Sequence, residues 1–452
     1  MATSALFPFL KMAPMCVMAR AAIEFLLQPD RINELFRRTA KVQYTRNLLF
    51  SHIVELMAAV VLRAEPSVLA AYKKRVGKIP ASDQAVYDKL QLVEPEVSQE
   101  LVRYAHAQAA AVVDSLQERE KPLLPGYRCR IFDGNHLSAS QHRIKELRRT
   151  WDAPLPGKVL VVLDQETHTA ADVFLTPDGH AQERSLLDQV LETVQERDLW
   201  IADRNFCTFK FLHGIDHKAA AFVIRQHGQV HGTLQGNRRS VGRTDAGDVF
   251  EQELELSLED STYAVRRVTI ELDRPTRDGD KEIHILTNLP GEAADAVKVA
   301  ELYRRRWTIE GLFLEITQTM ECEPNALGYP QAALFAFCLA LVAHAGVTMV
   351  RAGLSAEHGK ETVDQMSAYY MALEISQTQA GMLIAVPDEC WVGYSRLTGS
   401  KMAAELKAIA TYVDPNRYRK SKRGPKKKQP DRGKYSNGGH VSTHKLLQKR
   451  KE

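Results

Sequence analysis

The sequence predicts a mixed α/β fold. Helices come first, an α/β unit follows and is interrupted by an antiparallel β segment, and further helices and a basic tail complete the chain. Three patterns predict this order. Apolar residues recur at three- and four-residue steps near the start, short β-branched runs then alternate with helical patterns, and polar turns separate alternating runs in the middle. Of the 452 residues, 44% are hydrophobic and 26% charged, which excludes a collagen-like or intrinsically disordered chain.

The first part of the chain, residues 1–125, is predicted to be a separate helical domain. Four segments have the helical spacing of apolar residues, and prolines separate them. The segments are AAIEFLL (21–27), INELFRR (32–38), HIVELMAAVVL (52–62) and ELVRYAHAQAAAVVDSL (100–116).

Residues 126–226 are expected to form the first part of the α/β unit, because short strand-like runs surround one amphipathic helix, ERSLLDQVLETVQER (183–197). The predicted strands are YRCRIFD (127–133), KVLVVLD (158–164), ADVFLTP (171–177), LWIAD (199–203) and AAAFVIR (219–225).

The pattern then changes to alternating runs separated by polar turns, which predicts an antiparallel β insertion over residues 227–290. A long helix is expected over 293–320. The remaining boundaries follow from the helical patterns and the charge of the tail. They are 291–355 for the second part of the α/β unit, 356–410 for C-terminal helices and 411–452 for the basic tail.

One stretch, Ala332–Val350, has 19 residues without a formal charge, close to the length that spans a membrane. It is rich in Ala and contains His344, Gly346 and Thr348. We interpret it as a helix buried on all sides in a large domain, with a membrane span as the alternative. We therefore expect no membrane partner.

Charge is unevenly distributed along the chain. Residues 417–452 contain fourteen Lys or Arg and two acids, so this end carries about +12, whereas the remaining residues are mildly acidic. A basic tail on an acidic body predicts a polyanionic partner, nucleic acid above all, and a solvated, disordered terminus is compatible with it. The six cysteines are irregularly spaced without a C-x-x-C pair, which indicates reduced thiols of a cytosolic protein, and the start lacks the pattern of a signal peptide.

Carboxylates at strand ends are the candidate functional groups, because Mg²⁺ prefers oxygen ligands. Two predicted strands end in an acid, Asp133 in IFDGN and Asp203 in WIADRNF. Asp164, in VVLDQE, also ends a strand and is a rival. Each of these acids has the simpler interpretation of a turn former.

The helix predicted over 293–320 supplies a third acid, Glu310. At about 100° per residue, Arg306 and Thr317 lie on the same stripe as Glu310, together with Tyr303. An ordinary i,i+4 surface pair is the alternative for Arg306 and Glu310. Apolar residues on the opposite side are expected to dock the helix: Leu302, Ile309, Phe313 and Ile316.

The segment YRRRWTIE (303–310) resembles the signature of the insertion-sequence 4 family of DDE transposases, since Tyr303, Arg306 and Glu310 match its spacing. Thr317 stands where that family has Lys. Other segments extend the resemblance over roughly residues 120–445. They are FDGN (132–135) and DRNF (203–206), similar to the two Asp motifs but with Asn205 where Gly is usual, then ILTNLP (285–290), Tyr329–Pro330, KRGPKKK (422–428) and GGHVST (438–443).

The resemblance implies an RNase H-like fold, a mixed five-stranded sheet with a β insertion before the helix that bears Glu310. It implies a metal-binding catalytic triad of Asp133, Asp203 and Glu310, which would hold two Mg²⁺ or Mn²⁺ ions. The implied activity is cleavage of transposon ends and their joining to target DNA by metal-dependent phosphoryl transfer.

The resemblance also implies the partners. These are double-stranded DNA, as terminal repeats and as target, and further copies of the chain in a DNA-bound homo-oligomer, in a bacterial cytoplasm. The N-terminal domain would bind DNA ends, Tyr303 and Arg306 would contact phosphates, and Thr317 would offer a hydrogen bond without a charge. The tail would add DNA contacts through Lys422, Arg423, Lys426, Lys427 and Lys428.

Two alternatives stay open at this point. A catalytically idle, DNA-binding descendant of such a transposase is favoured by Thr317 and disfavoured by the intact triad. A structure-specific nuclease of the same fold is disfavoured by the Tyr–Arg–Glu helix and the basic tail. The sequence contains no P-loop and no H-E-x-x-H motif, so nothing in it indicates an NTPase or a zinc protease.

Overall fold

The computed structural model describes residues 5–43, 47–141, 154–258, 261–276, 278–322, 324, 326–421 and 424. Its first part is helical, as the sequence predicts, and three of its helices begin at a proline, whose missing N–H costs nothing at a helix start. The helices are α1 (Phe7–Met12), α2 (Pro14–Leu26), α3 (Pro29–Thr39), α4 (Phe50–Val61), α5 (Val68–Lys73), α6 (Asp83–Gln91) and α7 (Pro95–Ser115).

The strands of the described residues form one nine-stranded sheet in the order β3-β2-β1-β4-β5-β9-β8-β7-β6. β1 pairs antiparallel with β2 and parallel with β4, and β5 pairs antiparallel with β9. The strands are β1 (Arg128–His136), β2 (Lys158–Asp164), β3 (Thr169–Thr176), β4 (Asp198–Ala202), β5 (Ala221–Arg225), β6 (Gly232–Thr244), β7 (Gly247–Leu258), β8 (Ser261–Leu272) and β9 (Glu282–Thr287).

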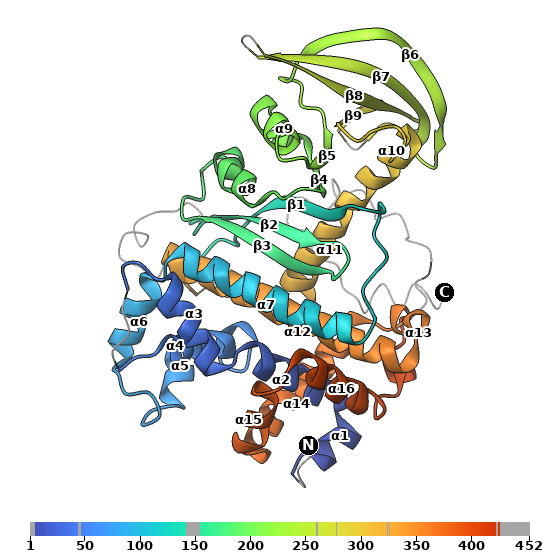
Figure 1. Cartoon of the computed structure of the whole chain (residues 1–452). Helices are drawn as coiled ribbons and strands as arrows, with labels where there is room; N and C mark the ends of the chain where they lie inside the picture. Colours follow the sequence, from blue (N-terminus) through green and yellow to red (C-terminus); the bar gives the residue numbers. More distant parts are fainter. Residues whose placement is uncertain are drawn as a thin grey trace, which may run out of the picture.

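The predicted β insertion is antiparallel, as expected, but it does not form a sheet of its own. Val223 of β5 lies opposite Thr287 of β9, so β9, β8, β7 and β6 extend the sheet that the first five strands begin. The upper part of Figure 1 shows these long strands continuing beyond β5. The expectation of five strands therefore describes the start of the sheet and not its full width.

Each face of the sheet has its own layer of helices (Figure 1). On one face, α8 (Leu187–Thr193) and α9 (Phe209–Asp216) enclose a small apolar core around Phe132 and Trp200. On the other face, α7 and α12 (Pro330–His358) share a larger core with the N-terminal helices. The amphipathic helix predicted over 183–197 is shorter than expected, a 3₁₀ turn η2 (Glu183–Leu186) followed by α8.

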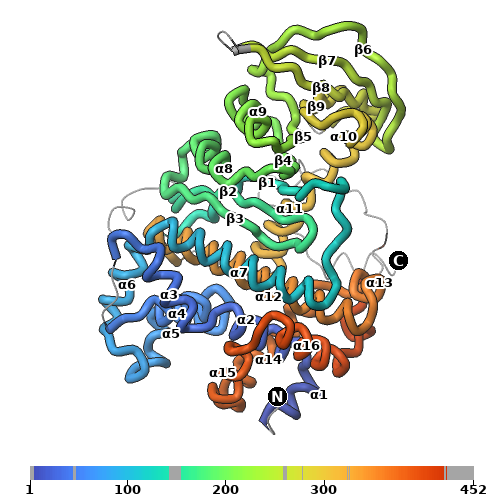
Figure 2. Tube along the Cα trace, in the orientation of Figure 1, coloured from blue at the N-terminus to red at the C-terminus, as the bar shows by residue number. Residues whose placement is uncertain are grey.

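Helix α12 is the centre of the larger core. It is long and apolar enough to cross a membrane, but 89% of its most apolar window is buried inside the protein, which supports the interpretation as a buried helix. It contacts α2, α4, α7 and α16 (Gly399–Ala410). Figure 2 shows α2, near the N-terminus, beside α14 (Ala368–Ala385), α15 (Glu389–Ser395) and α16, so segments far apart in the sequence share this core.

The last described segment is packed against the body of the protein. The 3₁₀ turn η6 (Pro415–Tyr418) follows α16, and the Tyr418 side chain is buried with its hydroxyl donating to the Glu374 carboxylate. The backbone N–H of Ser367, just after α13 (Lys360–Asp364), donates to the Tyr418 carbonyl at 2.7 Å. The predicted tail contacts lie outside the described residues: Lys422, Arg423, Lys426, Lys427 and Lys428. The six cysteines all lie within the described ranges and form no disulfide there.

Substitution by Ala should have opposite effects on stability at two glycines, because one lies where α12 crosses α16 and the other has open space around it. At Gly353 an added Cβ would stand 2.9 Å from the Leu406 Cβ, so Gly353→Ala should lower the free energy of unfolding by about 1–3 kcal/mol. At Gly381, in α14, an added Cβ meets no described atom within 4 Å. Gly381→Ala should therefore raise stability by roughly 0.5–1 kcal/mol through helix propensity. Denaturant unfolding measures both, and equal losses for the two variants would contradict the crossing.

Candidate active site

The parallel pairing of β1 with β4 brings two of the predicted acids together. Arg128 lies opposite Asp198 and Ile131 opposite Ile201, and the same register continued two residues places Asp133 beside Asp203. Side chains alternate along a strand, so both acids point to the face of Ile131 and Ile201, which is the face of the larger core. The convergence of these two acids in one catalytic site stays a prediction.

The expectation that Asp133 ends its strand is wrong. β1 continues to His136, because it stays paired with β2 up to His136 opposite Lys158. What ends near Asp133 is the neighbouring strand, since β4 stops at Ala202. Asp203 then caps the 3₁₀ turn η3 (Arg204–Phe206), where its Oδ1 accepts the Arg204 N–H at 2.7 Å.

The third acid comes from a helical segment that is not one continuous helix. The predicted helix over 293–320 is divided into α10 (Ala296–Arg304), the 3₁₀ turn η4 (Arg305–Trp307), α11 (Thr308–Leu314) and the π-helical turn η5 (Glu315–Thr319). Leu302, Ile309 and Ile316 are fully buried and dock it, as expected. Tyr303 and Arg306 are also buried, whereas the Glu310 side chain is 46% exposed.

Arg306 joins two of the three acids. Its Nη1 lies 3.0 Å from Asp133 Oδ2 and 3.4 Å from Glu310 Oε1, so the two carboxylate oxygens lie no farther apart than the sum of these distances. The guanidinium also stands over the Trp307 ring, 4.5 Å from its centroid. Its Nε is buried without a hydrogen-bond partner among the described residues. The pair Arg306–Glu310 is therefore part of a cluster and not an isolated surface ion pair.

The pKa values of this cluster reflect burial and mutual repulsion. Burial raises the pKa of Asp133 to about 6, Arg306 and the Gly134 N–H oppose this, and the nearby charges of Asp203 and Glu183 add to it. Burial alone would lower the pKa of Arg306, but Tyr303 and the three acids raise it. Burial raises the pKa of Tyr303 to about 12. Arg306 thus stays charged and stabilises acids that would otherwise repel one another.

Asp164, the rival for the first acid, belongs to a different cluster. It lies opposite Arg130 in the β1–β2 pair, three residues along β1 from Asp133, which is about 10 Å. Arg130 Nη1 donates to Asp164 Oδ2 at 2.5 Å, and the His106 ring of α7 lies 3.8 Å from the same oxygen. Although burial opposes it, this environment lowers the pKa of Asp164, whose carboxylate lies between Arg130 of β1 and His106 of α7.

Thr317 lies on the π-helical turn and is partly buried. Its hydroxyl donates to the Phe313 carbonyl at 2.8 Å, so it is engaged with the backbone of its own helix. The turn is anchored to α12 through Glu315, which lies 3.4 Å from His344 Nε2 and 3.5 Å from Arg351 Nη1. Burial opposes the ionisation of Glu315, but these two partners lower its pKa to about 2. Contact of Thr317 with DNA stays a prediction.

Sequence reasoning missed one acid beside the cluster, Glu183, at the start of η2. Its carboxylate accepts a hydrogen bond from Asn205 Nδ2 at 2.6 Å. A Cβ at Gly134 would overlap that carboxylate, so the glycine leaves room for it. A Glu at the start of an amphipathic helix is common, and the only sequence signals were Gly134 next to Asp133 and Asn205 close to Asp203.

The donor set suits a hard divalent cation, because three carboxylates gather around one positive charge in a partly buried site. Their arrangement does not form a finished site: among the described residues, no group of three or more His, Cys, Asp or Glu side chains could hold a metal ion as it stands. Arg306 lies between Asp133 and Glu310 and supplies the cation that these acids require. Metal ligation by Asp133, Asp203 and Glu310 stays a prediction.

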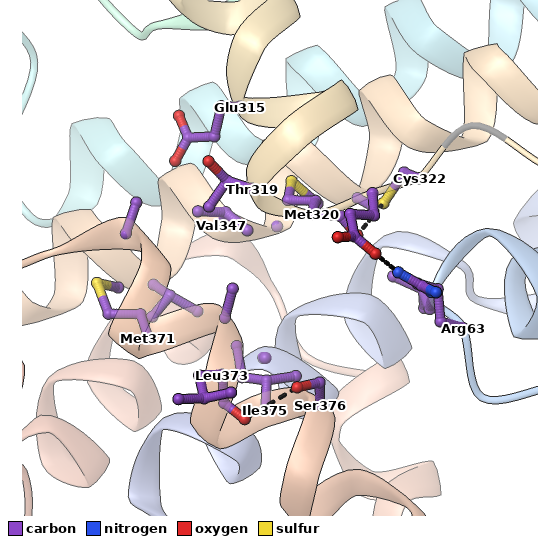
Figure 3. A pocket seen from close by; sticks show the side chains of 18 of the residues that line it. Arg63, Glu315, Thr319, Met320, Cys322, Val347, Met371, Leu373, Ile375 and Ser376 are labelled. Carbon is purple, nitrogen blue, oxygen red and sulfur yellow. Dashed lines mark hydrogen bonds and ion pairs between the residues drawn. The ribbon is translucent and has the colours of Figure 1, made fainter. Parts of the chain in front are cut away.

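An apolar cavity lies elsewhere. It has a volume of about 470 Å³ and is lined by residues of α2, η5, α12 and α14. Figure 3 shows Met320, Val347 and Met371 around it. Arg63 and Glu321, which also line it, form an ion pair. None of the three candidate acids lines it, so it is separate from the carboxylate cluster.

Comparison with known proteins found one family model that matches part of the chain and a solved structure to which the chain is similar. Residues 124–344 match the family model described as a transposase DDE domain, a stretch that includes Asp133, Asp203 and Glu310. This match supports a DDE transposase. The chain is also similar to piggyBac transposase, in the cryo-EM structure of its synaptic complex with hairpin DNA, at 10% identity and a TM-score of 0.42 over 85% of each chain. No curated protein matches the chain.

The opposite pKa shifts of two neighbouring acids predict opposite pH effects. Asp133 binds its proton more tightly in the folded chain than its ordinary pKa of 3.8 allows, so the stability it contributes is present below pH 4 and lost as the pH rises through about 6. Between pH 4 and pH 7, wild type should therefore lose about 2–3 kcal/mol relative to Asp133→Asn.

Asp164 provides the control, because its pKa is lowered and its contribution is lost only at acidic pH. Asp164→Asn should be less stable than wild type by an amount that stays constant between pH 5 and pH 7. Denaturant unfolding in the presence of a chelator measures both variants. Parallel pH curves for wild type and Asp133→Asn would contradict the raised pKa of Asp133.

Proposed function

We propose that this chain, with its match to the transposase DDE domain, is a DNA transposase that cleaves transposon ends and joins them to target DNA. The observation that carries the proposal is the gathering of Asp133, Asp203 and Glu310 around Arg306. Asp133 lies on β1, Asp203 directly follows β4 and Glu310 lies on α11, and all three are within the segment that matches the domain. The insertion-sequence 4 assignment, which rests on the spacing of Tyr303, Arg306 and Glu310, is part of the same proposal.

In this proposal Asp133, Asp203 and Glu310 hold divalent cations, Mg²⁺ or Mn²⁺, and two ions suit the chemistry. Bound ions would stabilise the attacking and leaving oxygens of an in-line displacement at phosphorus. The protein contributes the fixed placement of the three carboxylates, since β1 and β4 are paired and α11 is docked by Ile309.

The reaction has two displacements. Water attacks the phosphorus at the transposon end, a new P–O bond forms, and the 3′ oxygen leaves and takes up a proton. That 3′ hydroxyl then attacks a phosphodiester of the target strand, so one phosphodiester is exchanged for another without a covalent enzyme intermediate. No nucleotide hydrolysis is required, which agrees with the absence of a P-loop from the sequence.

Arg306 and Tyr303 are proposed to bind the phosphate next to the scissile bond. The guanidinium fork matches phosphate oxygens, and its ion pairs with Asp133 and Glu310 place it beside the acids. The proposed partner is double-stranded DNA, as terminal repeats and as target, and the DNA-bound form is a homo-oligomer. We place this activity in the bacterial cytoplasm.

An idle descendant of a transposase is the alternative, and it is not favoured. Loss of function is expected to remove acids that are costly to gather, yet all three acids are present and Arg306 still pairs with two of them. Thr317 changes a proposed phosphate contact and leaves the acids untouched. We therefore expect a lower affinity for DNA and a retained cleavage activity.

The proposal predicts that Asp133→Asn, Asp203→Asn and Glu310→Gln each lower Mg²⁺-dependent cleavage of terminal-repeat DNA by more than about 100-fold, because each removes one proposed ion ligand. DNA binding, measured by mobility shift, should change little. Glu301→Gln, on the exposed side of α10, is the matched control and should cleave like wild type. Undiminished cleavage by any of the three variants would remove that residue from the triad.

A second prediction concerns the tail, which should be removed after Ser421 because Tyr418 is buried. Deleting residues 422–452 removes eleven Lys or Arg, so the fall of log affinity for DNA with log salt should become shallower. Replacing only Lys426, Lys427 and Lys428 by Gln should reduce the slope by up to about three units, one for each phosphate that is no longer neutralised. An unchanged slope in both proteins would show that the tail does not touch DNA.

A further inference from the structure

Glu183 stands next to the proposed triad but has no part in it. It begins η2, which precedes α8 on the face of the sheet opposite α7 and α12. Its carboxylate occupies the space that a side chain at Gly134 would fill. Gly134 follows Asp133 on β1, so Glu183 reaches the strand immediately beside the first acid.

Glu183 and its neighbour Arg184 hold one residue from two sides. Asn205 Nδ2 donates to Glu183 Oε2 at 2.6 Å, and Arg184 Nε donates to the Asn205 backbone carbonyl at 2.6 Å. Asn205 is the middle residue of η3, the turn that Asp203 caps. The side chain and the backbone of this turn are therefore both bonded to the same dipeptide.

The turn needs such support because the sheet does not provide it. β4 ends at Ala202, and the β1–β4 pairing ends at Ile131 opposite Ile201, so Asp203 lies beyond the last ladder pair. Phe206 packs on Phe132 with ring centroids 4.7 Å apart, which fixes the far end of the turn. The bonds from Glu183 and Arg184 fix its middle.

The alternation of side chains separates Glu183 from the place where ions are proposed to bind. Asp133 shares a face with Ile131, whereas Gly134 shares a face with Phe132. Glu183 fills the Gly134 side, so its carboxylate approaches β1 from the face opposite Arg306. This placement fits a residue that orients the site better than one that ligates in it.

We propose that Glu183, with Arg184, is a positioning residue that holds the Asp203 turn against β1 through Asn205, and so fixes Asp203 relative to Asp133. The proposal deepens the function proposed above and rests on it only for its effect on DNA cleavage. Second-layer hydrogen bonds of this kind typically change metal affinity by roughly 10–100-fold. The hydrogen bond, rather than the charge of Glu183, is what matters.

The experiment separates the charge of Glu183 from its hydrogen bond to Asn205 by comparing three variants. In Asn205→Asp two carboxylates face each other, so the bond is broken. In Glu183→Gln the new amide oxygen still accepts from Asn205. In the double variant Glu183→Gln/Asn205→Asp, the introduced amide donates to the introduced carboxylate, which restores a bond of reversed polarity at the same net charge as wild type.

Two readouts need no DNA: hydrogen exchange of the amides of residues 203–208 in the free protein, and Mn²⁺ affinity by calorimetry. Asn205→Asp should speed exchange in this segment and weaken Mn²⁺ binding by roughly 10–100-fold. Glu183→Gln should stay within about threefold of wild type, and the double variant should recover most of the loss of Asn205→Asp. Glu183→Gln as impaired as Asn205→Asp, with no recovery in the double variant, would overturn the proposal.

Gly134→Ala gives an independent test that leaves both partners in place, because the added methyl displaces the Glu183 carboxylate. It should speed exchange in residues 203–208 while exchange in α12 stays at the wild-type rate. Unchanged exchange in residues 203–208 would overturn the proposal. Cleavage of terminal-repeat DNA is measured on the same proteins. A wild-type chain that fails to cleave would overturn the proposed function, and the exchange pattern would still decide the role of Glu183.

Discussion

The parallel pairing of β1 with β4 is the constraint on which the candidate site depends. Its register, continued by two residues, sets Asp133 beside Asp203, and β4 ends just before Asp203. The other two acids of the site approach this pair from opposite faces of the sheet. Glu310 arrives on a helix docked against the same face, and Glu183 arrives from the opposite face where Gly134 leaves room. A register shift of one residue would turn one of the two acids to the other side of the sheet.

Gathering acids in a partly buried place is unfavourable, and the protein offsets the repulsion with one guanidinium. Arg306 is buried, pairs with Asp133 and Glu310, and stands over the Trp307 ring. The same side chain is proposed to hold phosphate when DNA is bound. In this proposal Arg306 has two kinds of anionic partner, the carboxylates in the free protein and the phosphate in the DNA complex. The proposed phosphate contact would link the stability of the free protein to the binding of substrate through this residue.

The sequence predicts local structure well and the through-space part of the site less well. The run KVLVVLD matches β2 residue for residue, because a β-branched stretch bounded by turns has few alternatives. An acid after an apolar run predicts a strand end at Asp133, whereas pairing with β2 carries the strand to His136. The segment 293–320 is predicted as one continuous helix because it contains no Pro, and nothing else in its sequence indicates the 3₁₀ and π-helical turns. Glu183 was not found, since its hydrogen bond to Asn205 joins residues 22 positions apart and leaves no periodic pattern in the sequence.

The position of α12 has a consequence for how the chain is made. This helix begins at Pro330, yet α2, α4 and α7, which are synthesised first, bury their apolar sides against it. A ribosome that has made the first two-thirds of the chain has therefore produced helices without their central partner. The apolar surfaces of these helices therefore stay exposed, bound by chaperones or loosely associated with one another, until α12 has been synthesised. Chains that end before Pro330 would lack the central helix of the larger core as well as the tail, so proteases are expected to degrade them.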